Sequence, residues 1–138
     1  MQLPEFNFHC PRHLRDALEL KQASGPRARF LAGGTDLLVH LKKGLTTADS
    51  LIDLSRIQDL ARITREKEFL FIGACATMAA ISSHAIVRQR FPALRSGCEN
   101  LGSHLIRNRA TIGGNACNAS PAGDTLCPLL VYKAAACL

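Results

Sequence analysis

The feature that most restricts the fold is a glycine pair placed between a short segment that prefers a β-strand and a short segment that prefers an α-helix. An apolar segment at residues 28–31 is typical of a buried strand and leads directly into Ala32-Gly33-Gly34-Thr35-Asp36. Residues 37–42 have the spacing of a short helix that Thr35 or Asp36 would cap and that would end at Gly44. A strand that turns sharply into a helix indicates a β-α-β unit, so we expect a parallel sheet here.

The flanking segments extend this unit in both directions. Residues 6–8 are typical of an extended segment, and Pro11 suits the first turn of a helix that follows. The apolar face of that helix would consist of Leu14, Ala17 and Leu18, with Leu20 as a further candidate. Residues 51–54 then predict the next strand. Strands that alternate with helices in this way predict a small parallel sheet with right-handed crossovers.

The pattern changes after residue 57. Residues 60–64 and 68–73 flank a charged turn, which predicts an antiparallel hairpin. Helices are expected behind Thr77 as N-cap and over the segments 84–90, 92–101 and 128–135. We therefore predict a mixed α/β (α+β) fold with a small α/β subdomain, residues 1–57, and a second subdomain, residues 58–138.

A second glycine pair lies in the turn-rich stretch 102–124, which we predict to be one long loop. It occurs in Thr111-Ile112-Gly113-Gly114-Asn115, after the basic Arg107 and Arg109 and before Ser120 and Asp124. A loop of this length in a compact domain is uncommon unless it binds something. Without side chains, glycines allow a flat ring or a pyrophosphate to lie against the main chain.

Each glycine pair taken alone also describes an ordinary turn or surface loop. Neither matches the Rossmann GxGxxG pattern or the GxxxxGK[ST] phosphate loop. Backbone N–H groups before a helix favour phosphate, however. Two separate glycine-rich turns therefore suit a long ligand with a diphosphate in its middle.

Composition disfavours several other functions. The net charge is +6, but the basic residues are scattered and only 5% of residues are aromatic, which disfavours nucleic-acid binding. The six cysteines form no CxxC pair and the five histidines have no metal-ligand spacing, so we expect reduced thiols and no metal site. The sequence has no GxSxG motif and no Ser/His/Asp or Cys/His set typical of a hydrolytic site, so we expect no catalytic side chain. No apolar run approaches the ~20 residues of a membrane span, and the N-terminal sequence is unlike a signal peptide, so we expect a cytoplasmic location.

Four segments together resemble one family. They are AGGTDLL at 32–38, LIDLSRI at 51–57, IGACATMAAI at 72–81 and IRNRATIGGNACNASPAGD at 106–124. In this order they are similar to the FAD-binding subunit of molybdenum hydroxylases, the family of xanthine dehydrogenase, carbon monoxide dehydrogenase and 4-hydroxybenzoyl-CoA reductase. The resemblance implies the FAD-binding fold of the vanillyl-alcohol oxidase and p-cresol methylhydroxylase type. FAD would lie between a small parallel-sheet lobe and a mainly antiparallel lobe, which is incomplete here at its C-terminus.

The resemblance also implies roles for individual residues. By matching position, residues 31–38 would wrap the diphosphate through main-chain N–H groups, and residues 111–115 would hold the diphosphate and the flavin side from the second lobe. Leu101 would lie beside the flavin, and Asp124 would hydrogen-bond the ribityl and ribose region. The implied cofactor-binding residues are Leu31, Ala32, Gly33, Gly34, Thr35, Asp36, Leu37, Leu38, Leu101, Thr111, Ile112, Gly113, Gly114, Asn115 and Asp124.

The implied function is that of an electron-transfer subunit. Electrons from a molybdenum cofactor in a large subunit would pass through [2Fe–2S] clusters in a small subunit to FAD, and then to an external acceptor. Three alternatives stay open. They are a nucleotide- or anion-binding module without redox activity, a truncated and inactive flavoprotein fragment, and an assembly piece that docks through exposed apolar ends.

Overall fold

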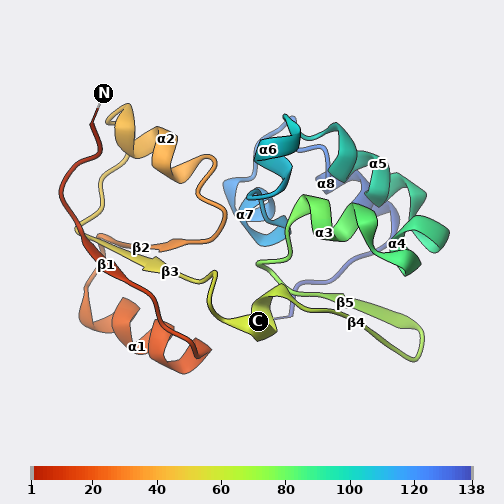
Figure 1. Cartoon of the computed structure of the whole chain (residues 1–138), viewed down its shortest axis with the longest axis horizontal. Helices are drawn as coiled ribbons and strands as arrows, with labels where there is room; N and C mark the ends of the chain where they lie inside the picture. Colours follow the sequence, from red (N-terminus) through yellow and green to blue (C-terminus); the bar gives the residue numbers. More distant parts are fainter. Residues whose placement is uncertain (1, 138) are drawn as a thin grey trace.

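The computed structural model describes residues 2–137, and its first group of elements is a small three-layer unit (Figure 1). The elements are β1 (Asn7–His9), α1 (Leu14–Ala23), β2 (Ala28–Leu31), α2 (Leu37–Lys42) and β3 (Ser50–Asp53). The strands pair in the order β1-β3-β2, and both pairings are parallel. The structure thus confirms the predicted parallel sheet.

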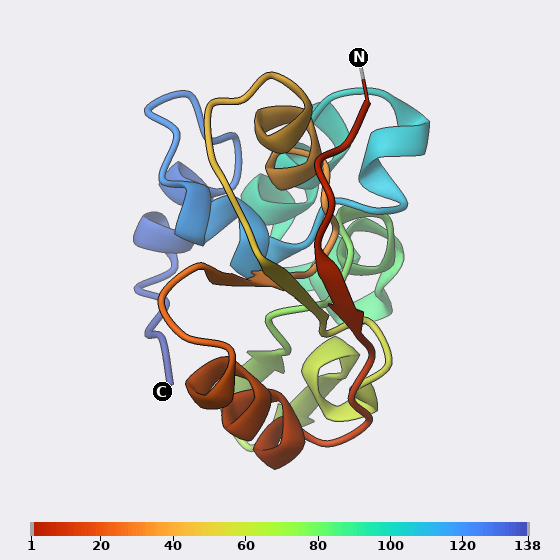
Figure 2. The ribbon, with the colours of Figure 1, turned by 90° about the vertical axis from the view of Figure 1, so that its left-hand side faces the viewer.

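The sheet separates two small hydrophobic cores. Figure 2 shows the strands between α1 at the bottom and α2 at the top. Successive strand residues point to opposite faces, so Ile52 packs with Ala17 on the α1 side whereas Leu51 packs with Leu41 on the α2 side. This arrangement fixes the end of β2, from which the chain turns into α2.

Two details of the first unit differ from expectation. The first helix begins at Leu14, with His13 rather than Pro11 at its boundary, and His13 makes no side-chain capping bond. Leu14 and Leu18 are 48% and 54% exposed, whereas Ala17 is fully buried. The buried side of α1 runs through Ala17 and the partly buried Leu20, and the narrow sheet leaves the other two leucines on the flank of the helix.

The second group of elements begins with a 3₁₀ turn and a hairpin. These are η1 (Gln58–Ala61), β4 (Ile63–Glu66) and β5 (Phe69–Ile72). The strands are antiparallel, with Ile63 opposite Ile72 and Glu66 opposite Phe69. The predicted hairpin is therefore confirmed, but its first strand starts later than residue 60 because η1 occupies that part of the chain.

Helices dominate the rest of the second group. They are α3 (Met78–Ser83), α4 (Ala85–Arg90), α5 (Pro92–Asn100), α6 (His104–Arg107), α7 (Ile112–Asn118) and α8 (Leu126–Val131). Their shared core includes Met78, Ile81, Val87, Leu94 and Cys98. The hairpin packs Leu70 and Ile72 against this core, which leaves Phe69 and Phe71 exposed on the opposite face of β5.

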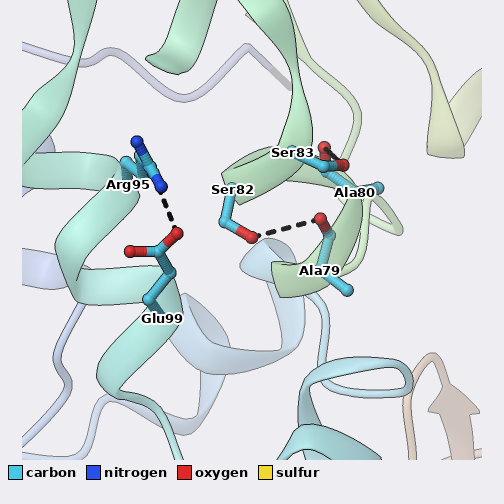
Figure 3. A network of polar contacts seen from close by, with 6 residues as sticks. All are labelled: Ala79, Ala80, Ser82, Ser83, Arg95 and Glu99. Carbon is cyan, nitrogen blue, oxygen red and sulfur yellow. Dashed lines mark hydrogen bonds and ion pairs between the residues drawn. The ribbon is translucent and has the colours of Figure 1, made fainter.

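Polar side chains of α3 and α5 stay within their own helices. Figure 3 shows Ser82 Oγ donating to the Ala79 carbonyl at 3.2 Å and Arg95 pairing with Glu99 one turn along α5 at 2.8 Å. An exposed pair of this kind contributes only about 0.3–0.5 kcal/mol. The contact between α3 and α5 is therefore held by the hydrophobic core.

The prediction of one long loop over residues 102–124 was wrong, because α6 and α7 lie within it. Thr111 Oγ1 accepts from Gly114 N at 3.1 Å and caps α7, while Ser103 Oγ caps α6. At Gly113, a Cβ atom would lie 2.7 Å from the Ala74 Cβ. Close packing thus compensates for the poor helix propensity of the glycine pair.

Candidate functional site

A cleft of about 820 Å³ lies between the two groups of elements. This volume is within the range of about 300–1,000 Å³ typical of small-molecule sites. The predicted residues that line it are Ala32, Gly33, Gly34, Thr35, Asp36, Leu37, Leu101, Thr111, Gly113, Gly114, Asn115 and Asp124. Most of the predicted site is therefore brought together, although its two main segments are far apart in the sequence.

Three predicted residues do not line the cleft. Leu31 and Leu38 pack in the core beneath α2, and Ile112 packs in the core of the second group. Each has an apolar side chain at an inward position of its strand or helix. Any contact of these residues with a ligand would have to use the main chain.

The two glycine-containing segments touch at Gly33. A Cβ atom at this position would lie 2.1 Å from the Arg109 carbonyl oxygen and 2.8 Å from its carbonyl carbon. Both atoms belong to backbone, so no side-chain rotation would make room. Gly33 therefore allows residues 32–37, which we call the first glycine turn, to pack directly against the segment before α7.

The first glycine turn presents unpaired N–H groups. Gly34 has φ +77°, a left-handed conformation that favours glycine, and its carbonyl accepts from Leu38 N at 3.1 Å. Within residues 2–137, none of the six amide N–H groups from Ala32 to Leu37 donates to a backbone or side-chain acceptor. Consecutive free amides ahead of a helix form a surface suited to an anion.

The second glycine pair differs in this respect. Ile112 N donates to the Ala76 carbonyl at 3.1 Å, Gly113 N donates to the Ala74 carbonyl at 2.8 Å, and Gly114 N donates to Thr111 Oγ1. These amides are already used within the protein. The side of the cleft formed by residues 111–115, which we call the α7 wall, thus presents the surface of its two glycines and the side chain of Asn115. It does not present a row of free N–H groups.

A hydrogen bond from a buried hydroxyl supports the side of the cleft that α7 forms. Thr125 Oγ1 donates to Asn115 Oδ1 at 2.6 Å, and Thr125 is fully buried. Asp124 lies beside it, and its carbonyl packs against Gly97 of α5, where a Cβ atom would be only 2.4 Å away. The segment that carries Asp124 is thereby held to both α5 and α7.

Several lining residues were not predicted from the sequence. They include Arg29, Phe30, His40, Thr46, Leu54, Ala74, Cys75, Ile106 and Cys117. Arg29 and Phe30 are exposed at the middle of β2 because this strand forms the edge of the sheet that faces the cleft. A polar residue in an otherwise apolar strand was the only sequence signal for Arg29.

Cys75 is the one buried thiol among the residues that line the cleft within the described chain. Burial raises its pKa above the ordinary value, and the nearby Asp53 carboxylate raises the pKa further. The group is therefore a neutral thiol at physiological pH and a poor nucleophile. Arg29, Asp36 and Asp124 supply charged side chains of both signs to the cleft.

No helix within residues 2–137 combines the length and apolar character that crossing a membrane requires.

Comparison with known proteins identifies a family whose described ligand is of the kind that this cleft suits. Residues 4–138 match the family described as the FAD binding domain in molybdopterin dehydrogenase. The chain is 34% identical over 129 residues to the xanthine dehydrogenase FAD-binding subunit of Escherichia coli O157:H7, covering 93% of this chain and 44% of that one. It is also 34% identical over 123 residues to the nicotinate dehydrogenase FAD-subunit of Eubacterium barkeri, covering 88% and 42%.

A solved structure is similar as well. Carbon monoxide dehydrogenase from Hydrogenophaga pseudoflava superimposes with a TM-score of 0.88 at 34% identity, over 91% of this chain and 44% of that one. The chain thus spans less than half the length of these relatives. By sequence and by fold, it belongs to the family of FAD-binding domains of molybdopterin dehydrogenases.

Proposed function

We propose that this chain binds FAD in the cleft and serves as the electron-transfer flavoprotein part of a molybdenum-dependent hydroxylase or dehydrogenase. The observation that carries the proposal is the row of six free amides in the first glycine turn, on the same cleft as Gly113 and Gly114. A diphosphate requires several hydrogen-bond donors and a close approach of the main chain, and the first glycine turn supplies both.

The residues of the cleft fit a flavin dinucleotide on its physical requirements. The first glycine turn would hold the diphosphate, and the flat surface of Gly113 and Gly114 would lie against the ligand from the opposite wall. Leu101 offers an apolar contact, and the Asp124 carboxylate would accept hydrogen bonds from ligand hydroxyls. Leu31, Leu38 and Ile112 would support these segments from below.

When bound, FAD would supply the coupling between one-electron transfer from [2Fe–2S] clusters and two-electron transfer to an external acceptor. The protein groups would bind the cofactor, orient it and limit its contact with water. In this proposal a large subunit carries the molybdenum cofactor and a small subunit carries the clusters. The division of the chain at residues 57 and 58, and a cytoplasmic location, remain predictions from the sequence.

A nucleotide- or anion-binding module without redox activity is the second candidate, because the same free amides would also hold pyrophosphate or ADP. The two functions differ in what the α7 wall contributes. If the chain is a flavoprotein, FAD binds more tightly than ADP, and ADP competes for the same site. Equal affinity for FAD and ADP, with no change in the flavin spectrum, would favour the simple module.

The direct test compares two glycine substitutions with similar backbone strain. Gly34 and Gly44 have φ values of +77° and +69°, but only Gly34 lines the cleft. The backbone strain of Ala would cost each variant about 1 kcal/mol of folding stability. At Gly34 the added Cβ would also lie 3.0 Å from Leu31 Cδ1 and 3.1 Å from Leu38 Cδ1, whereas at Gly44 it would meet no atom within 4 Å. In Gly34→Ala, the backbone of the first glycine turn would also shift, so we expect the FAD dissociation constant to rise about tenfold, whereas Gly44→Ala leaves it unchanged.

The measurement is quenching of FAD fluorescence on titration with the 138-residue chain. Circular dichroism of both variants checks that the fold is retained. Equal effects of the two substitutions on FAD affinity would contradict the proposed role of the first glycine turn. A wild-type chain that takes up no FAD would contradict the proposed function itself.

A further inference from the structure

Thr125 lies outside the cleft and was not expected to contribute to the site. We propose that it is a positioning residue, which orients the side-chain amide of Asn115 so that its NH₂ group faces the cleft as a donor to an acceptor oxygen of the bound nucleotide. This inference rests on the proposed FAD site, and it assigns a polar contact to the wall that lacks free backbone amides.

The orientation follows from the burial of Thr125. Its side chain is 0% exposed, so its hydroxyl has no contact with bulk water. Thr125 occupies the N-cap position of α8, but its hydroxyl makes no capping bond. The hydroxyl instead donates to Asn115 Oδ1 at 2.6 Å. A buried hydroxyl hydrogen without an acceptor is costly, so the amide oxygen of Asn115 is held toward Thr125.

The consequence appears at the other end of the amide. With Oδ1 directed toward Thr125, the Nδ2 group lies away from it, and Nδ2 donates to no acceptor within residues 2–137. Asn115 is partly exposed and lines the cleft. If the amide were reversed, two donors would face Thr125, and the buried hydroxyl hydrogen would lose its acceptor. The cleft therefore receives two N–H donors instead of a carbonyl oxygen.

The position of Thr125 is fixed independently of α7. The neighbouring Asp124 carbonyl packs against Gly97 of α5, where even a methyl group would not fit. The Thr125 carbonyl accepts from Leu129 N at 3.1 Å in the first turn of α8. The hydroxyl is thus presented from a rigid point and can select one orientation of a side chain ten residues earlier in the sequence.

The test uses three variants of the 138-residue chain. Thr125→Val keeps the shape of the side chain but removes the hydroxyl, whereas Thr125→Ser keeps the hydroxyl and is the matched control. Asn115→Asp keeps an oxygen acceptor for Thr125 but removes the NH₂ group. We expect Thr125→Val to raise the FAD dissociation constant about five- to tenfold, as for the loss of one hydrogen bond, and Thr125→Ser to stay near wild type.

The double variant separates positioning from a purely structural role. If Thr125 acts through the amide, adding Thr125→Val to Asn115→Asp has no further effect on FAD affinity. If Thr125 only holds the segment of Asp124, the two effects on binding free energy add. Additive effects, or wild-type affinity in Thr125→Val, would overturn the proposal.

A second readout needs no ligand. In the NMR spectrum of the free protein, the side-chain NH₂ signals of Asn115 are identified by their loss in Asn115→Asp. We expect them to shift or broaden in Thr125→Val and to be retained in Thr125→Ser. Unchanged signals in Thr125→Val would refute the orienting role. If Thr125→Val changes the Asn115 signals as expected but the wild-type chain binds no FAD, the result would contradict the proposed function alone.

Discussion

Gly33→Ala tests whether the two groups of elements are joined by direct backbone packing. The added methyl group would lie 2.1 Å from the Arg109 carbonyl oxygen and 3.0 Å from Ala110 Cα. A relaxed carbon–oxygen contact is about 3.3 Å, so the two segments would have to separate by roughly 1.2 Å, the difference between 3.3 and 2.1. The change therefore forces a movement of main chain against main chain.

The segment around Arg109 is poorly able to move. Arg109 N and Ala110 N both donate to the Ile106 carbonyl, at 2.9 and 2.7 Å, and the Ala110 carbonyl accepts from Met78 N at 2.9 Å. A shift that relieves the clash would strain these bonds. We expect a loss of about 2–3 kcal/mol in the free energy of unfolding, at the upper end of the range for overpacked sites.

Urea denaturation followed by circular dichroism measures this loss, with Gly44→Ala as the control. An added Cβ at Gly44 meets no atom within 4 Å, so its cost is only the backbone strain of about 1 kcal/mol. A Gly33→Ala variant that is no less stable than Gly44→Ala would refute the close approach of the first glycine turn to the Arg109 backbone. Ligand affinity is not needed for this comparison.

Two further predictions concern a buried thiol in the core of the second group and the N-cap of α3. Burial raises the pKa of the Cys98 thiol to about 12 from an ordinary value of 9.0, and the Glu99 carboxylate adds to this rise. Because the unfolded chain releases this proton first, we expect stability to fall between about pH 9 and 12, and Cys98→Ala to remove that part of the decline in alkaline urea titrations. Thr77→Ala removes the acceptor for Ala80 N, a bond of 3.2 Å, and should cost about 1 kcal/mol in the same assay. Equal urea midpoints for Thr77→Ala and wild type would argue against a stabilising role of Thr77 as the N-cap of α3.

Local chemistry explains which elements could be predicted. The second helix has the predicted bounds, Leu37–Lys42, because a glycine pair precedes it and Gly44 follows it in a left-handed conformation. The hairpin was recognisable by alternation, although η1 displaced the start of its first strand. In these cases the signal lies within a few residues of the element.

Tertiary contacts explain the failures. The helix α7 contains a glycine pair of low helix propensity, and it forms because Gly113 packs against Ala74 and Thr111 caps its first turn. The exposure of Leu14 and Leu18 depends on the width of the sheet beneath α1, which the helix sequence does not encode.

The site was predictable only in part, for the same reason. Its glycines were visible in the sequence, and the resemblance to a family indicated which of them belong together. The contact between Gly33 and Arg109, the free amides of one turn and the satisfied amides of the other depend on long-range packing. The role that we assign to Thr125 depends on burial, which a single polar residue after Asp124 does not reveal.

The backbone ladder beneath α7 has a consequence for motion. Met78 N, Ile112 N and Gly113 N donate to Ala110, Ala76 and Ala74, and an isolated bridge joins Thr77 to Thr111. One wall of the cleft is therefore tied by backbone hydrogen bonds to the segment before α3 and to α3 itself, so moving it would break several of these bonds at once. We expect local opening of the cleft to begin on the opposite side, where the amides of the first glycine turn make no hydrogen bonds that would have to break.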